Sequence, residues 1–293
     1  MDEQKDQLVR GLTATHTTAL VVGIVIGTGV FLKTAVMTQD VGTPTLVMAA
    51  WVAAGLLSLA GALSYAELGA MLPAAGGEYV YLKKSYGDTA AFLFGWQRFI
   101  VAGSGSNASL ASGFAIFLAA FLPLNAVWAR REVSLLGQTI DWQFGPRQLV
   151  AVGAILFLSV VNCFSVALRP RARSWASTAV WSLGVQAVWS SLLAVSGTFD
   201  QLTDSLLFAS WIFYGLVTSS VFVLRRKMPE AARPYRTLGY PVVPAIFVLV
   251  SAWLVVNTLV EKRVESVTGL VLILAGLPLF FWFRSRSPRP RSG

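Results

Sequence analysis

Two glycines and a threonine in the middle of the first long apolar run are the residues best suited to binding chemistry. The run from Thr15 to Val36 contains the triplet Gly27-Thr28-Gly29. Because glycine weakens a helix, the triplet predicts a local break. A broken helix leaves the backbone N–H groups of its second half without helical partners, and these groups and the helix dipole favour an anion. Discontinuous membrane helices can bind a carboxylate in this way.

The same glycines also fit a purely structural role. Gly23 and Gly27 are four residues apart, and small residues at this spacing let two membrane helices pack closely. The packing role does not require the additional glycine, Gly29, whereas a break in the helix is helped by it. The local sequence leaves both roles open.

Glu67 is a second group with chemical potential, near the end of the second apolar block, in the stretch SYAELGAMLPAAGGEYVYLKKSYG. An ionisable side chain at this depth is costly and suggests a role. It could pair with Lys83 or Lys84 near the membrane interface, or it could contact a solute, and we favour the pairing. The glycines Gly76-Gly77 are expected to help end the helix and turn the chain.

Small and polar residues crowd the third apolar block between Val101 and Gly113, which reads VAGSGSNASLASG. Such residues let membrane helices approach closely and form hydrogen bonds between them. We favour this packing role over one in which the residues line a path for a solute.

The elements that position these residues must cross a membrane. Charged residues make up 13% of the chain, about half the share in soluble domains. A helix satisfies its own backbone hydrogen bonds in lipid and spans it with about 20 apolar residues. The sequence therefore predicts an all-α, polytopic transmembrane helical bundle of about eight helices. The eight apolar blocks are approximately Thr15–Val36, Thr45–Leu72, Thr89–Leu122, Gln148–Leu168, Ala176–Val195, Leu202–Leu224, Val242–Val260 and Ser266–Phe283.

The positive charges predict the orientation of these blocks. If the N-terminus is cytoplasmic and the blocks alternate, sixteen Lys and Arg residues lie on the cytoplasmic side and six on the other. This bias predicts cytoplasmic N- and C-termini in the cytoplasmic membrane. The first ten residues show no pattern of a cleavable signal peptide. The cationic stretch from Arg284 to Arg291 is expected to face anionic membrane lipid rather than nucleic acid.

Several classes of site are excluded by what the sequence contains. His16 and Cys163 are the only histidine and cysteine, so neither a His/Cys metal site nor an intrachain disulfide is expected. The sequence has no nucleophile elbow, phosphate-binding loop or suitably spaced carboxylate pair. We therefore expect no enzyme, no cofactor and no metal.

The motifs GIVIGTGVF and SYAELGAMLPAAGGEYVYLKKSYG closely resemble the amino acid–polyamine–organocation superfamily of transporters, most of all its L-type amino acid transporter branch. The C-terminal stretch from SGTFDQLTDSLLFASWIFYG onward is similar to the last helices of that branch. The resemblance implies an amino acid permease, often an exchanger, that works by alternating access. Its partners would be the amino acid substrate and the surrounding membrane lipid.

The resemblance also implies site residues. In the family the unwound glycine triplet of the first helix holds the substrate carboxylate, and its counterparts here are Ile26, Gly27, Thr28, Gly29 and Val30. The motif WIFYG lies on a helix that gates the cavity in the family, which implies that Tyr214 is a gate. The alternatives are lipid contact for Trp211 and ordinary packing for Tyr214.

The chain also departs from the family pattern. Residues 1–168 resemble the family's helices one to four, and residues 174–284 resemble helices nine to twelve. Helices five to eight have no counterpart, which indicates an internal deletion near residues 168–174. The family's second broken helix, which binds the substrate amine, is among those missing. We expect one integral membrane domain over residues 1–293.

Two functional hypotheses follow. The first is a permease or exchanger that recognises an amino acid. The second is an internally deleted family member that does not transport, or that acts only as a membrane interaction partner. The particular amino acid, the coupling mode, and any oligomer or single-span partner are left open by the sequence.

Overall fold

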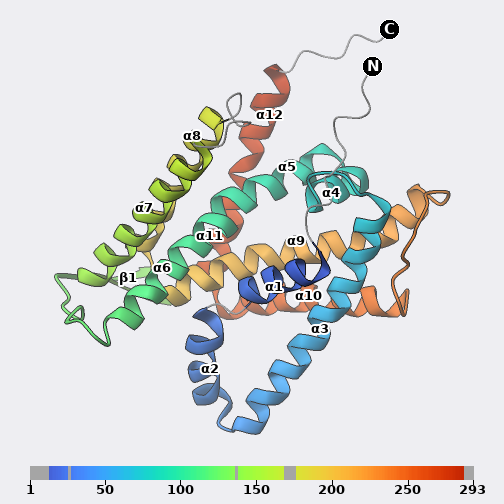
Figure 1. Cartoon of the computed structure of the whole chain (residues 1–293). Helices are drawn as coiled ribbons and strands as arrows, with labels where there is room; N and C mark the ends of the chain where they lie inside the picture. Colours follow the sequence, from blue (N-terminus) through green and yellow to red (C-terminus); the bar gives the residue numbers. More distant parts are fainter. Residues whose placement is uncertain (1–12, 26–27, 136–137, 168–175, 287–293) are drawn as a thin grey trace. The chain divides into compact units, whose positions relative to one another are not determined.

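A computed structural model describes residues 13–25, 28–135, 138–167 and 176–286 of the chain. Helices make up nearly all of its regular structure (Figure 1). The elements are α1 (Ala14–Val25), α2 (Thr28–Val41), α3 (Pro44–Met71), α4 (Glu78–Tyr86), α5 (Asp88–Gln97), the π-helical segment η1 (Arg98–Gly103), α6 (Ser104–Leu118), β1 (Ala129–Leu135), β2 (Gln138–Phe144), α7 (Pro146–Ala167), α8 (Ala176–Ser196), α9 (Phe199–Lys227), α10 (Val242–Glu261), α11 (Arg263–Leu274) and α12 (Gly276–Arg286).

Seven helical stretches of the described chain are long and apolar enough to cross a bilayer. They are α3, the continuous stretch α5–η1–α6, α7, α8, α9, α10 and the continuous stretch α11–α12. The prediction of a polytopic helical membrane protein is confirmed. The first apolar block differs from the other seven, because α1 and α2, with 12 and 14 residues, are each shorter than the about 20 residues of a full crossing.

The chain divides into two compact units. The first unit consists of Met1–Phe94 and Trp211–Leu254, and the second of Gly95–Ser210 and Val255–Gly293. The sequence passes from one unit to the other within the stretches that form α5, α9 and α10. The expectation of one integral domain over residues 1–293 stays a prediction.

In the first unit, α3 and α10 approach closely at a glycine. A Cβ atom added at Gly61 would lie 2.6 Å from a ring carbon of Phe247, so only glycine fits there without a shift. The rings of Phe94 and Phe213 meet edge to face, with centroids 5.7 Å apart. The core of the unit is completed by fully buried leucines of α3, α4 and α9, namely Leu68, Leu82 and Leu224.

In the second unit, α6, α7 and α8 pack side by side (Figure 1). Small residues on all three helices let their backbones approach, which is how membrane helices pack in the absence of a hydrophobic driving force. The buried cluster comprises Ala108, Ala111, Ala115, Ala151, Ile155, Ala187, Ala194 and Leu202.

A β-hairpin connects α6 to α7 and was not predicted from the sequence. Strands β1 and β2 pair antiparallel, with Ala129 opposite Phe144 and Leu135 opposite Gln138. Ile140, Trp142 and Phe144 alternate with polar residues, a pattern typical of a strand. The hairpin lies in the connection between two spans and leaves the helical character of the membrane part unchanged.

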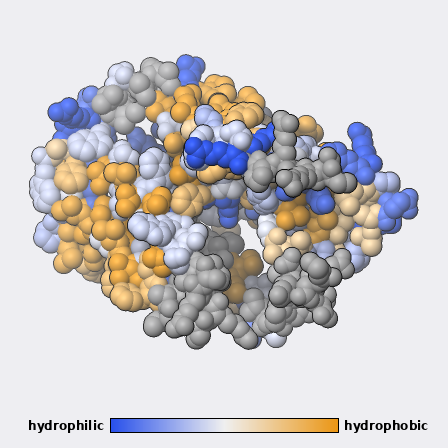
Figure 2. All heavy atoms as spheres, turned by 90° about the horizontal axis from the view of Figure 1, so that it is seen from above, coloured by the Kyte–Doolittle hydropathy of each residue, from blue (hydrophilic) through white to orange (hydrophobic). Residues whose placement is uncertain are grey.

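The surface of the described residues is rich in large apolar side chains (Figure 2). Trp181 and Phe157, for example, are 77% and 68% exposed. Exposed apolar area on this scale is unusual for soluble proteins. It fits a chain whose helices face lipid.

Candidate functional site

The first apolar run is divided between two helices. Helix α1 ends at Val25 and α2 begins at Thr28, and Figure 1 shows the two helices pointing in different directions. Of the predicted carboxylate site, Ile26 and Gly27 lie outside the described residues, whereas Thr28, Gly29 and Val30 form the first residues of α2. The N-terminus of α2 therefore falls within the predicted site, and carboxylate binding there stays a prediction.

The alternative role for these glycines, close helix packing, can be examined at Gly23. A Cβ atom added at Gly23 would meet none of the described atoms within 4 Å. Gly23 therefore makes no close helix contact within the described part of the chain. By contrast, Gly61 of α3 does make such a contact, with Phe247.

Glu67 of α3 is almost completely buried and receives several donors. Arg225 of α9 donates from Nε and Nη2 to the two carboxylate oxygens, at 2.8 and 2.7 Å. The backbone N–H of Thr237 donates to Oε2 at 2.7 Å, and the Thr237 hydroxyl lies 3.4 Å from the carbonyl oxygen of Leu63. A two-pronged guanidinium contact of this kind is a strong, directional ion pair.

Arg233 and Tyr240 extend this cluster into the α9–α10 connection. Nε of Arg233 lies 3.7 Å from Oε1 of Glu67. Its Nη2 donates to the carbonyl oxygen of Met228 at 2.7 Å and to that of Leu224 at 3.3 Å, which is a terminal carbonyl of α9. The ring of Tyr240 lies 3.6 Å from the guanidinium carbon of Arg225. One carboxylate therefore ties the connection to α3.

The expected partners of Glu67 were wrong. Lys83 lies 3.3 Å from Asp88, in an exposed pair, while Arg225 and Arg233 hold Glu67. The basic run around Arg225 was visible in the sequence, but pairing across 158 residues has no local signal. The role, a paired carboxylate rather than a solute contact, was the favoured one.

Tyr214, the predicted gate, lies in α9 and is partly buried. Its ring meets that of Trp211 edge to face at 6.0 Å, and Trp211 in turn lies 5.9 Å from Phe247. These are packing contacts within one unit. Gating by Tyr214 stays a prediction.

The small polar residues after Val101 serve the packing of the second unit, as favoured from the sequence. Ser109 of α6 and Thr203 of α9 share a hydrogen bond of 2.8 Å. The π-helical segment η1 widens the helix here, and Nε1 of Trp189 donates to the carbonyl oxygen of Ile100 at 2.8 Å. Side chains of neighbouring helices therefore satisfy polar groups that the π-helix leaves open.

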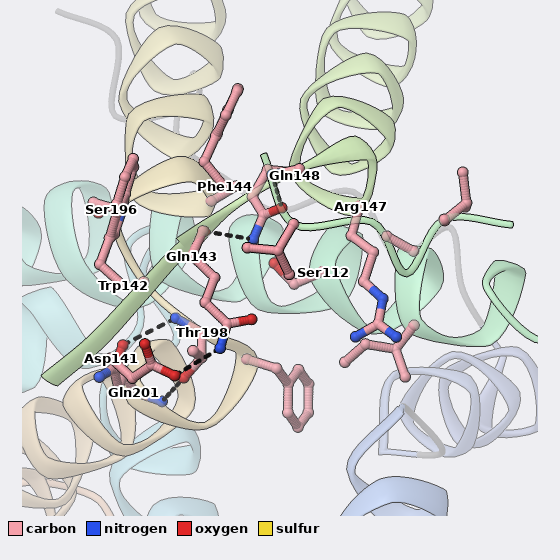
Figure 3. Close-up of a pocket in the computed structure, with 18 of the residues that line it drawn as sticks. Ser112, Asp141, Trp142, Gln143, Phe144, Arg147, Gln148, Ser196, Thr198 and Gln201 are labelled. Carbon is pink, nitrogen blue, oxygen red and sulfur yellow. Dashed lines mark hydrogen bonds between the residues drawn. The ribbon is translucent and has the colours of Figure 1, made fainter. Parts of the chain in front are cut away.

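A polar cavity lies beside the hairpin, in the second unit (Figure 3). We call it the hairpin pocket. Its volume is about 340 Å³, and its polar lining includes Asp141, Gln143, Arg147, Gln148, Thr198 and Gln201. The residues come from β2, from the first turn of α7 and from the α8–α9 connection with the start of α9.

Hydrogen bonds hold much of the hairpin pocket in place. Oε1 of Gln148 accepts from the backbone N–H of Gly145 at 3.0 Å, and Nε2 of Gln148 donates to the carbonyl oxygen of Gln143 at 3.0 Å. Nε1 of Trp142 donates to the carbonyl oxygen of Val195 at 2.9 Å. These bonds join β2 to α7 and α8 and make the pocket wall rigid.

Asp141 is the acidic residue of the hairpin pocket. The hydrogen bond from Nε2 of Gln143, at 2.6 Å, and the one from Nε of Arg130, at 2.9 Å, hold the pKa of Asp141 below its ordinary value. The same contact raises the pKa of Arg130. Asp141 is therefore ionised at neutral pH. Among the described residues, no group of three or more His, Cys, Asp or Glu side chains is arranged to hold a metal ion.

Sequence reasoning did not find the hairpin pocket. Asp141 and Trp142 lie between two of the predicted apolar blocks, and nothing in the sequence places them beside Thr198 and Gln201. The one available signal was the alternation of apolar residues in β2, which would have predicted the strand that carries them.

Comparison with known proteins gives one family and a set of relatives. The family model for amino acid permeases matches residues 12–183, more than half of the chain. The serine/threonine exchanger SteT of Bacillus subtilis (strain 168) is 33% identical over 143 residues, which cover 49% of this chain and 28% of SteT. The human b(0,+)-type amino acid transporter 1 is 27% identical over 251 residues, or 80% of this chain and 48% of that protein.

A third relative, the human cystine/glutamate transporter, is 26% identical over 261 residues, which cover 81% of this chain and 49% of that protein. The chain thus spans about half, or less, of the length of these relatives. The similarity extends over most of this chain in two of the three.

Proposed function

This chain belongs to the amino acid permease family, and on that premise we propose that it carries amino acids across the cytoplasmic membrane as a permease or exchanger. The proposal includes transport by alternating access, and it assigns the chain a function in transport rather than in catalysis. The relatives named as a serine/threonine exchanger and as a b(0,+)-type amino acid transporter support an amino acid as the solute.

The observation that carries the proposal is the division of the first apolar run. Among the described residues, helix α2 begins at Thr28, and the first four backbone N–H groups of a helix have no partner within that helix. We assign Ile26, Gly27, Thr28, Gly29 and Val30 to the binding of the substrate α-carboxylate. The positive end of the α2 dipole favours a negative group at this position.

Two further assignments belong to the proposal. Tyr214 closes over the bound amino acid as a gate, and the N- and C-termini face the cytoplasm. The sixteen basic residues on the side of the termini support this orientation, because basic residues are retained on the cytoplasmic side.

The direct test is transport by the purified chain. Reconstituted alone into liposomes, it should take up a labelled amino acid faster than empty liposomes, and preloading with unlabelled amino acid should accelerate uptake if it is an exchanger. A panel of neutral, acidic and basic amino acids would define the solute. A monodisperse protein that moves none of them would contradict the proposal.

A second candidate is an internally deleted family member that does not transport and acts at most as a membrane interaction partner. The observation in its favour is coverage: the alignment with the human b(0,+)-type transporter takes in 80% of this chain but 48% of that protein. The same liposome experiment separates the two, because only the carrier predicts uptake that depends on the chain.

A further inference from the structure

The hairpin pocket has donors on one side and acceptors on the other, an arrangement that the proposed carboxylate site in the first apolar run does not explain. We propose that the hairpin pocket is a second binding site, which takes a neutral amino acid with an apolar side chain. The inference rests on the proposed function for the class of solute. The site lies on the side of the membrane that the charge distribution predicts to be outside.

The donor side is formed by Arg147. Its side chain is exposed at the start of α7 and its Nη2 donates to Oδ1 of Asn125. A guanidinium carries five N–H donors in a planar fork whose geometry matches a carboxylate. Arg147 is the group that binds the solute carboxylate, and Asn125 holds it in place.

The acceptor side is formed by Gln143 with Asp141. Because Nε2 of Gln143 donates to Asp141 at 2.6 Å, the amide is oriented and its Oε1 is left to accept. Figure 3 shows Asp141 and Arg147 on opposite sides of the pocket, with Gln143 between them. An ammonium group has donors only. It binds at Oε1 of Gln143, with the negative charge of Asp141 behind it.

The remaining wall is suited to an apolar side chain. The rings of Trp142 and Phe144 are stacked with centroids 6.2 Å apart, and Phe199 also lines the pocket. The volume of about 340 Å³ is near the lower end of the range of about 300–1,000 Å³ for small-molecule sites. The pocket therefore suits a single amino acid rather than a larger solute.

Charge balance distinguishes this occupant from a simple ion. An inorganic anion would use Arg147 alone, and a cation would use Asp141 alone. A neutral amino acid satisfies both sides and leaves the charge of the pocket unchanged. Two analogues of leucine test whether the pocket binds a simple ion instead. 3-Methylbutylamine lacks the carboxylate, and 4-methylpentanoate lacks the ammonium group.

The experiment is equilibrium binding of tritiated L-leucine to the purified full-length chain in detergent. The variant Gly29→Leu removes the proposed carboxylate site in the first apolar run, so the leucine that remains bound reports the hairpin pocket. In this background Arg147→Gln and Asp141→Asn should each weaken binding by about tenfold or more, since a hydrogen bond to a charged group is lost. Each analogue should compete at least about tenfold less well than leucine.

Two matched variants control for charge and for the ion pair. Arg131→Gln removes an exposed arginine of β1 that does not line the pocket. Arg130→Gln breaks the ion pair of Asp141 but keeps its carboxylate. Both should bind leucine within about twofold of the parent chain. If Gly29→Leu does not fold, the number of bound leucines is measured in the chain with Gly29 intact. There, Arg147→Gln should remove one bound leucine per chain.

The outcomes are distinct from those for the proposed function. In the Gly29→Leu background, leucine binding that resists both Arg147→Gln and Asp141→Asn would overturn the second site. In the chain with Gly29 intact, an unchanged number of bound leucines in Arg147→Gln would overturn it as well. Equal competition by either analogue would overturn it as well, in favour of a simple ion site. Loss of binding in Arg147→Gln together with unchanged transport in Gly29→Leu would support the hairpin pocket and contradict the site in the first apolar run.

Discussion

A carboxylate inside a membrane helix is stable only if donors reach it, and Glu67 receives them from Arg225, 158 positions later in the chain. The side chain of Glu67 is 2% exposed and that of Arg225 is 23% exposed. Removing one partner from a buried pair leaves an uncompensated charge, which costs far more than the net contribution of the pair.

We predict that Glu67→Gln lowers the free energy of unfolding by about 3 kcal/mol, because Arg225 loses its counter-charge and the amide offers one acceptor oxygen where the carboxylate has two. The measurement is thermal or denaturant unfolding in detergent. The double variant Glu67→Gln with Arg225→Gln should be less destabilised than the sum of the single variants, because the two residues are coupled.

Asp88→Asn is the control, since it removes an exposed ion pair with Lys83 and should change stability by about 0.5 kcal/mol or less. Equal effects of Glu67→Gln and Asp88→Asn would contradict the account of the cluster.

Asp141 gives a prediction about pH. Its pKa is lower in the folded hairpin than in the unfolded chain, first because Gln143 donates to it and then because of Arg130. The stability that Asp141 contributes is therefore present above its unfolded pKa of about 3.9 and is lost as the pH falls through the folded pKa.

We expect the hydrogen-exchange protection of the β1–β2 amides, corrected for the intrinsic rate, to fall as the pH is lowered below about 4. In Asp141→Asn the protection should start lower and show no such fall. If the protection of the wild-type chain and that of Asp141→Asn depended on pH in the same way, this role for Asp141 would be excluded.

At the scale of elements, two glycines of α3 occupy opposite environments. A Cβ atom added at Gly61 would lie 2.6 Å from the ring of Phe247, which is itself buried, whereas one added at Gly55 would meet nothing within 4 Å. The two positions share a helix and differ in packing.

We predict that Gly61→Ala destabilises the chain by about 1–3 kcal/mol, because α10 must shift. Gly55→Ala should leave the stability unchanged or raise it by up to about 1 kcal/mol, because alanine favours a helix more than glycine does. Unfolding of both variants in the same detergent checks this, and a tolerated Gly61→Ala would show that the approach of α3 and α10 is not tight.

The elements differ in how far they could be predicted from the sequence. The long helices followed from apolar runs. The glycine triplet predicted a break in the first run, and α1 ends at Val25 and α2 begins at Thr28, so that Thr28 and Gly29 are helical. The turn before α4 was also predicted from its two glycines, and Gly76 and Gly77 adopt positive φ values of 113° and 48° there. Strand β2 was missed, since it lies between two apolar blocks and carries no long apolar run of its own.

Contacts between distant elements were the part of the candidate site that could not be predicted. Glu67 was correctly judged to need a partner, but the charges nearest in sequence, Lys83 and Lys84, were the wrong choice. The hairpin pocket joins β2, α7 and α9, and no periodicity within one element reports such a junction. Local chemistry was therefore readable, whereas its distant neighbours were not.

For the whole molecule, the distribution of basic residues predicts which ends of the helices face the cytoplasm. In a chain with Cys163→Ala, a cysteine placed in the hairpin by Ser134→Cys should react with a membrane-impermeant maleimide in intact cells. A cysteine placed by Ser285→Cys, at the end of α12, should react only after the membrane is opened. Both positions are exposed, and the reverse pattern would show that the orientation is inverted.

The central claim is that this chain carries an amino acid whose carboxylate binds at the break in the first apolar run. The most direct measurement compares uptake by liposomes containing the parent chain, Gly29→Leu and Gly23→Leu. Gly23 lies in the same run but has no described atom within 4 Å of an added Cβ, so its substitution controls for bulk. The account predicts that uptake is lost in Gly29→Leu and retained in Gly23→Leu. Uptake that survives in Gly29→Leu, or is absent from the parent chain, would contradict it.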